Sequence, residues 1–218
     1  MVMFKKLFGR NKEKSSVRSL DQAHDLQKGD ALKIGFDEHP EISNQQFFVQ
    51  KVTGLDLTEK SGFERRIFHI GNTVEGRPLL MWIDDEIGAD RLAFAYGADQ
   101  PHVQEMINVE QFAEIFSPDR DHLVEVDALK ASLQGNPWLS TPYTEDQAKE
   151  VYWLDNDPRS VATAETISKD ETACDYFRLT SKDRQAAIEA FVFSGGKTDV
   201  YFVKYLPLYK IEELMPSG

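Results

Sequence analysis

Short apolar runs separated by turn-forming residues dominate the first half of the chain. Five such runs lie between Gly29 and Gly97, at 31–36, 47–57, 63–70, 78–83 and 92–96. Glycine, aspartate and asparagine stand between most of them. This arrangement is typical of successive antiparallel strands joined by short turns. The same pattern returns near the C-terminus, at 176–179, 187–193 and 200–206.

The turn between the last two of these runs carries a strong hairpin signal. Its sequence is Ser194-Gly195-Gly196-Lys197. Paired glycines adopt the positive φ angles that tight hairpin turns require. We therefore expect residues 187–193 and 200–206 to pair antiparallel. Residues 123–126 predict a short extended element, and 209–214 predict a last short element.

Helical spacing is clearest at residues 109–116. Apolar residues there repeat at i, i+3, i+4 and i+7, which gives one apolar stripe that includes Phe112 and Phe116. Asn108 precedes the stripe as a suitable N-cap. We expect this stripe to pack against the strands of the first half. Weaker helical patterns occur at 20–28 and at 145–153.

Together these elements predict a β-rich α+β fold with two antiparallel β-modules, meander-like or half-barrel-like, each with at least one short helix. Gly135-Asn136-Pro137 marks the boundary between the modules. The expected organisation is a tail and linker at 1–19, a first module at 20–135 with its helix near 109–116, and a second module at 136–218 with the C-terminal hairpin.

Composition narrows the class of protein. With 218 residues, of which 41% are hydrophobic, the chain is long enough to bury a core. The single cysteine, Cys174, excludes an internal disulfide framework, and we expect it to be a buried structural thiol. No apolar run reaches the length of a membrane span, and the N-terminus lacks the apolar region of a signal peptide. These patterns predict a cytoplasmic protein.

Charge is distributed unevenly along the chain. Residues 1–18 hold six basic residues and one acid, a net charge of +5, whereas the whole chain carries −12 and residues 19–218 therefore carry −17. An acidic body repels phosphate backbones, so we expect no nucleic-acid partner.

The basic N-terminal segment is also amphipathic. On helical spacing its apolar side chains share one face and its basic side chains lie on the others. Such a segment can bind weakly to an anionic membrane. The predicted membrane or partner contact comprises Phe4, Lys5, Lys6, Leu7, Phe8 and Arg10. The alternative is a tail that docks its two phenylalanines on its own domain, or a frayed terminus.

Three stretches together resemble a known family. They are Met3-Phe4-Lys5-Lys6-Leu7-Phe8-Gly9, Leu26-Gln27-Lys28-Gly29-Asp30, and Tyr176-Phe177-Arg178-Leu179 with Lys204-Tyr205-Leu206-Pro207-Leu208-Tyr209. Over nearly its full length the chain resembles the YjfK-like bacterial proteins, a family defined by a domain of unknown function. The resemblance implies a link to membrane or envelope stress and a phage-shock-protein-A-like partner. It implies no catalytic residues.

No residue pattern in the sequence amounts to a catalytic, cofactor or metal site. The five histidines lack metal-ligand spacing. Two acidic clusters, at 84–90 and 119–127, are interpreted as solvated turns rather than calcium sites. The Gly195-Gly196-Lys197-Thr198 string is not a phosphate-binding loop, because Phe191 stands where that loop needs its first glycine.

Three functions remain open after these observations. The sequence favours a non-catalytic interaction or adaptor protein, cytoplasmic and peripheral to the inner membrane through its basic N-terminus, with an unidentified protein partner. The alternatives are a small hydrolase-like enzyme whose acidic residues converge from different strands, and a ligand-binding β-barrel. An adaptor should expose an apolar patch or an open strand edge. An enzyme should bury carboxylates of raised pKa, and a ligand barrel should enclose its site.

Overall fold

The computed structural model describes residues 18–56, 65–85, 90–117, 125–126, 136–160 and 173–217. Their strands are β1 (Ala31–Ile34), β2 (Gln46–Asp56), β3 (Arg65–Val74), β4 (Arg77–Asp84), β5 (Arg91–Ala98), β6 (Glu125–Val126), β7 (Tyr143–Leu154), β8 (Ala173–Ser181), β9 (Ala186–Phe193), β10 (Thr198–Pro207) and β11 (Ile211–Met215). The helices are α1 (Gln100–Met106) and α2 (Val109–Glu114), with short 3₁₀ helices η1 (Ala23–Asp25), η3 (Pro158–Ser160) and η5 (Leu208–Lys210).

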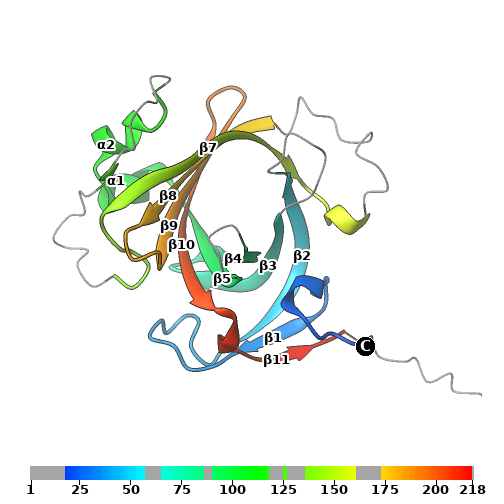
Figure 1. The fold of residues 1–218 in the computed structure, drawn as a ribbon. Coiled ribbons are helices and arrows are strands. Elements are labelled where there is room, and N and C mark those ends of the chain that lie inside the picture. The colour runs from blue at the N-terminus through cyan, green and yellow to red at the C-terminus, as the bar shows by residue number, and fades with distance from the viewer. Residues whose placement is uncertain are drawn as a thin grey trace, which may run out of the picture.

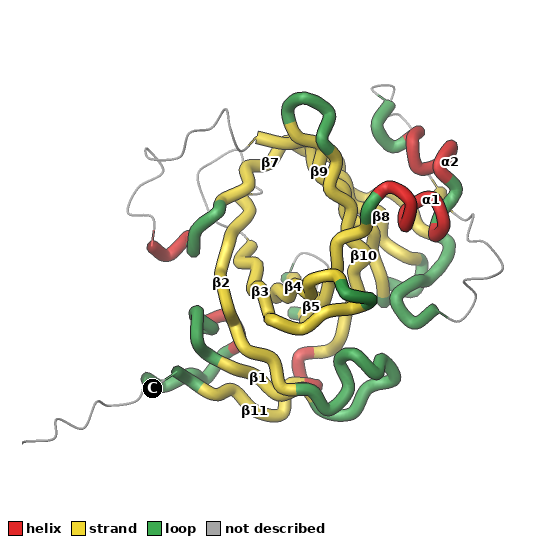
Figure 2. The backbone as a smooth tube through the Cα atoms, turned by 180° about the vertical axis from the view of Figure 1, so that it is seen from behind, coloured by secondary structure: helices red, strands yellow, loops and turns green. Residues whose placement is uncertain are grey.

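All these strands join one antiparallel sheet, in the order β11-β1-β2-β3-β4-β5-β10-β9-β8-β7-β6. An additional pairing between β2 and β7 closes the run from β2 to β7 into a barrel of eight strands. Figure 1 looks into this barrel, and Figure 2 shows it from behind. The β-rich α+β class predicted from the sequence is confirmed.

Strand β2 pairs with two different strands, β1 and β7, at its two ends. Its first residues pair with β1, as at Ala31 opposite Phe48, and its last residues pair with β7, as at Leu55 opposite Trp153. Between these two parts, the pairing of β2 with β3 shifts register between Val49 and Lys51. Gly54 suits this crossing, since an added Cβ would lie only 2.4 Å from Cγ of Pro158 in η3.

The wall of the barrel has an inner and an outer face, and both carry many apolar side chains. Successive side chains of a strand point to opposite faces, so Ala93 and Ala95 of β5 face inward whereas Phe94 and Tyr96 face outward. The outer face is covered by other parts of the chain: Phe47 packs on Phe94 at 5.3 Å between ring centroids. The β1–β11 layer therefore lies outside the wall formed by β3, β4 and β5 (Figure 1).

The predicted C-terminal hairpin is confirmed. Strands β9 and β10 pair antiparallel from Thr198 opposite Val192 to Lys204 opposite Ala186. The two glycines of the turn, Gly195 and Gly196, have φ angles of 85° and 82°. The two predicted modules do not form separate sheets, however, because β5 pairs with β10 along its whole length and β2 pairs with β7.

The predicted helix at 145–153 is wrong, because these residues belong to strand β7. The strand pairs with β8 from Tyr143 opposite Ser181 to Tyr152 opposite Ala173, and its last residues also pair with β2. Two neighbouring strands thus override the local helical pattern. The predicted helix at 20–28 is reduced to the three residues of η1.

Helix α1 was not predicted by the sequence analysis. It begins after Asp99, whose side chain accepts a hydrogen bond from the His102 amide.

Helix α2 begins where the sequence predicted. The Asn108 side chain accepts hydrogen bonds from two backbone amides of the first turn, and Phe112 is buried. The half-buried Phe116 packs edge-on against Phe177 of β8, with centroids 5.0 Å apart. The apolar stripe therefore reaches the second half of the chain, whereas we expected it to face the first.

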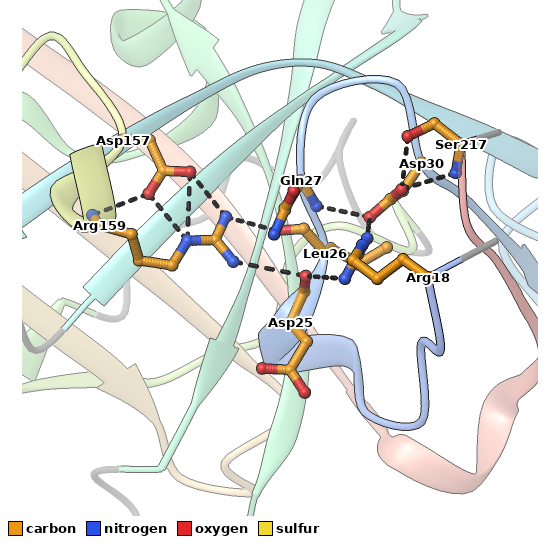
Figure 3. A network of polar contacts seen from close by, with 8 residues as sticks. All are labelled: Arg18, Asp25, Leu26, Gln27, Asp30, Asp157, Arg159 and Ser217. Atoms are coloured by element: carbon orange, nitrogen blue, oxygen red, sulfur yellow. Dashed lines mark hydrogen bonds and ion pairs between the residues drawn. The ribbon is translucent and has the colours of Figure 1, made fainter. Parts of the chain in front are cut away.

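A buried carboxylate ties the start of the described chain to its end. Asp30 forms an ion pair with Arg18 and accepts hydrogen bonds from the Gln27 amide (2.7 Å) and from the amide and hydroxyl of Ser217 (2.8 and 3.1 Å). Figure 3 shows this network beside Arg159, which bonds the Leu26 carbonyl. Burial raises the pKa of Asp30, but these hydrogen bonds outweigh burial and hold it below its ordinary value of 3.8.

Replacing Phe112 with alanine should lower the free energy of unfolding by about 3 to 5 kcal/mol, because the ring is buried and its space cannot be refilled. Val109→Ala in the same helix is the matched control: Val109 is 43% exposed, against 6% for Phe112. The control should cost less than about 0.5 kcal/mol. Urea unfolding of both variants measures the difference, and equal midpoints would contradict the packing of α2.

Asp30 should also shape the acid stability of the protein. Its pKa is lower in the folded than in the unfolded chain, so its contribution is present above pH 3.8 and is lost as the pH falls through the folded-state pKa. We expect Asp30→Asn to lower the free energy of unfolding at pH 7 by about 1.5 to 3 kcal/mol. A plot of this free energy against pH should then fall less steeply below about pH 4 than it does for the native protein. Asp155→Asn, at an exposed carboxylate, is the control. If the free energy of unfolding falls equally steeply with decreasing pH in the native protein and in Asp30→Asn, this role is refuted.

Candidate functional site

An ion pair crosses the interior of the barrel. Nη1 of Arg65 lies 2.7 Å from Oε2 of Glu189, and both side chains are almost fully buried. Arg65 is on β3 and Glu189 is on β9, which lie on opposite sides of the barrel: β4, β5 and β10 separate them along one path. The pair therefore spans the space that the eight strands enclose.

Aromatic rings surround the Arg65 guanidinium. It lies 4.8 Å from the ring centroid of Trp82 and 5.7 Å from that of Tyr176, and it donates a hydrogen bond of 3.4 Å to the Tyr176 hydroxyl. Arginine over an aromatic face is stabilised by the negative charge of the π-system. The rings thus offset part of the cost of burying this charge.

A second buried arginine lies beside the first pair. Arg178 of β8 stands opposite Glu189 in the β8–β9 register, contacts Asp84 at 3.9 Å and donates a hydrogen bond of 3.1 Å to Asp146. Burial lowers the pKa of Arg178, but its neighbours, Asp146 among them, outweigh this and raise it. Arg178 therefore stays charged inside the protein.

A third arginine, Arg91, lies near the start of β5. Its guanidinium stacks on the ring of Tyr205 at 3.9 Å, and Arg91 stands opposite Asp84 in the β4–β5 register. We call Arg65, Trp82, Tyr176, Arg178, Glu189 and Tyr205 the interior cluster.

Burial changes the acid–base properties of this cluster. It raises the pKa of Glu189, although Arg65 and Arg178 oppose the shift. Burial also raises the pKa of Tyr205 well above 10, with the charge of Glu189 adding to the effect. Glu189 therefore binds a proton more readily than an ordinary glutamate does.

Several polar atoms of the cluster are buried without satisfying their hydrogen-bonding capacity. Trp82 is 2% exposed, and Glu189 and Tyr205 are each 1% exposed. Within the described part of the chain, Nε1 of Trp82, Oε1 of Glu189 and the Tyr205 hydroxyl have no hydrogen-bond partner. Each such group costs about 1 to 3 kcal/mol if it stays unpaired. The arrangement therefore calls for water or a ligand as the missing partner.

The inner face beside the cluster carries small side chains. Ala95 of β5 and Ala187 of β9 stand on either side of Val203 of β10, Ala93 stands opposite Tyr205, and all three alanines are buried. An alanine at an inward position fills far less of the barrel interior than a leucine or phenylalanine at the same position would. The bulkier inner side chains, such as Trp82 and Phe191, lie across from or beside them.

The structure brings together residues that the sequence analysis did not group. The predicted contact residues Phe4, Lys5, Lys6, Leu7, Phe8 and Arg10 lie outside the described residues. Asp84 was expected in a solvated turn, but it is 2% exposed and contacts Arg178. Arg65 shares the inward face of β3 with Ile67, so a charged residue on an apolar face was the signal that could have found it.

Other candidate chemistry remains structural. Cys174 is buried, as expected, and burial raises the pKa of its thiol to about 12, which leaves little thiolate at neutral pH. The described residues hold no group of three or more histidine, cysteine or acidic side chains placed to bind a metal ion. Within the described ranges, no helix has the length and apolar content that crossing a membrane requires.

The ion pair across the barrel can be tested by a double-mutant cycle. Glu189→Leu alone should cost about 3 to 5 kcal/mol, because it leaves the buried Arg65 without its carboxylate. The double variant Arg65→Met/Glu189→Leu should recover a large part of this loss, since no uncompensated charge remains. Additive losses in guanidinium unfolding would show that the two residues are not coupled.

Comparison of this chain with protein-family models, with curated proteins and with solved structures finds no match. The resemblance to the YjfK-like family, with the envelope-stress role it implies, therefore stays a prediction.

Proposed function

We propose that the protein binds a small molecule inside its barrel, at the interior cluster. The observation that carries this proposal is the set of buried polar atoms on Trp82, Glu189 and Tyr205 that lack partners within the described residues. A barrel of eight strands has an interior just wide enough to be filled by side chains or to hold one small ligand. Small inward residues on β5 and β9 favour the second use.

The unsatisfied atoms define the chemistry of the ligand. Nε1 of Trp82 only donates, Oε1 of an ionised Glu189 only accepts, and the Tyr205 hydroxyl does either. The surrounding side chains are mostly aromatic and apolar. The ligand is therefore a small, largely apolar molecule with at least one hydrogen-bond acceptor and one donor, since sites of this type combine apolar walls with a few placed polar groups.

A second candidate function is the adaptor role favoured by the sequence. Phe36 and Tyr209 are 75% and 80% exposed. They lie at the same end of the β1–β11 layer, because the Gly35 amide bonds the Lys210 carbonyl and Nζ of Lys210 bonds the Phe36 carbonyl. Two exposed aromatic side chains on neighbouring segments favour a contact with another protein.

Binding of 8-anilinonaphthalene-1-sulfonate tests the first proposal, because this probe has an aromatic body, an N–H donor and sulfonate acceptors and fluoresces in apolar sites. We expect one saturable site per chain, with energy transfer from tryptophan. Trp82→Phe, which keeps an aromatic ring but removes the N–H donor, and Ala95→Leu, which puts a bulkier side chain on the inner face, should each weaken binding by about tenfold, or 1.4 kcal/mol.

The matched control is Phe36→Ser/Tyr209→Ser, which removes exposed aromatic surface and leaves the interior intact. It should bind the probe like the native protein. If the native protein shows no saturable binding, or if Trp82→Phe and Ala95→Leu bind normally while both remain folded by circular dichroism, the interior site is refuted. Loss of binding only in Phe36→Ser/Tyr209→Ser would place the probe on the exposed surface and support the adaptor function instead.

A further inference from the structure

An open groove of about 760 Å³ lies between η1 and β11, on the outer side of the barrel wall. In Figure 1, η1 (blue) lies beside β1 and β11, near the C-terminal end. The groove is lined by Leu20, Asp21, Gln22, Ala23, His24, Asp90, Leu208, Ile211, Glu212, Glu213 and Leu214. None of these residues belongs to the interior cluster, so the groove is a separate feature.

The groove combines an apolar floor with an acidic rim. Leu20 and Ala23 belong to the outer core, and Leu208, Ile211 and Leu214 pack against that core while staying half-exposed. Four carboxylates surround them, at Asp21, Asp90, Glu212 and Glu213, and the described lining holds no lysine or arginine. Lys33 offsets one of these charges by pairing with Glu212 at 2.7 Å. The groove therefore suits an occupant that is both apolar and basic.

The N-terminal segment of the same chain has this composition and is attached at the edge of the groove. Residues 1–17 carry five basic residues and one acid, a net charge of +4. Arg18 is fixed by its ion pair with Asp30 and by a hydrogen bond of 3.1 Å to the Asp25 carbonyl (Figure 3). Leu20, two residues later, lines the groove. The segment is therefore attached, at its C-terminal end, next to the groove whose charge and apolar character it complements.

We propose that this groove holds residues 3–10 of the chain's own N-terminal segment. Phe4, Leu7 and Phe8 cover the apolar floor, and the basic side chains between and after them face the acidic rim. The ten residues from Arg10 to Leu20 can extend to about 33 Å, which is ample for the segment to fold back. The tether also gives an effective concentration in the millimolar range, so a weak contact suffices.

Docking in the groove would regulate what the segment can do elsewhere. The side chains that would enter the groove are the ones predicted to contact an anionic membrane or a partner. One segment cannot occupy both places, so the groove competes with either contact. Because both interactions depend on exposed charges, both weaken as salt rises.

A fluorescent peptide of residues 1–10 tests the proposal by competition on the full-length protein. In native protein the attached segment should block the groove. In the full-length variant Phe4→Asp/Phe8→Asp the groove should be free, so the peptide should bind at least about tenfold more tightly, as measured by fluorescence anisotropy. Adding Asp90→Lys/Glu213→Lys to that variant should remove this gain, because the rim becomes basic.

The matched control adds Glu105→Lys/Glu110→Lys to the same variant, which changes the net charge equally at exposed positions on α1 and α2. It should bind the peptide like its parent. Equal affinity of native protein and Phe4→Asp/Phe8→Asp overturns the proposal, as does equal loss in the rim and control variants. A native dimer in sedimentation that Phe4→Asp/Phe8→Asp dissociates would assign the groove to a second copy's segment and would also overturn it.

Discussion

The divided pairing of β2 is the constraint on which the rest of the structure depends. One strand pairs with β1 through its first residues and with β7 through its last, and its pairing with β3 shifts register between these two parts. Strand order alone would give an open sheet with β11 and β6 at its edges. The β2–β7 pairing turns most of that sheet into a barrel and leaves β1 and β11 outside it.

The closing of the sheet into a barrel explains why charged side chains are buried in the interior of this protein. An open sheet would have left Arg65, Arg178 and Glu189 on a solvated face, where ion pairs contribute little. Inside the barrel the same residues are desolvated, so each needs a partner, and the structure supplies carboxylates and aromatic rings. A buried pair of this kind is weak evidence for stability, because its desolvation offsets its attraction. The ion pair instead holds polar groups at fixed positions in the barrel interior.

Local elements of this fold could be predicted from the sequence, whereas contacts across the barrel could not. The β9–β10 turn was predictable because Gly195 and Gly196 by themselves dictate a tight turn. Strand β7 was not, because its central residues are strong helix formers behind Thr144, and only its neighbours β2 and β8 hold it extended. The residues of the Arg65–Glu189 pair lie 124 positions apart, and no local pattern links them.

The interior cluster and the outer groove share one structural element, the start of β5. Asp90 lines the groove, and Arg91, the next residue, stacks on Tyr205 of the interior cluster. Asp90 directly precedes β5 and Arg91 is its first residue, so one short segment of backbone carries a side chain to each site.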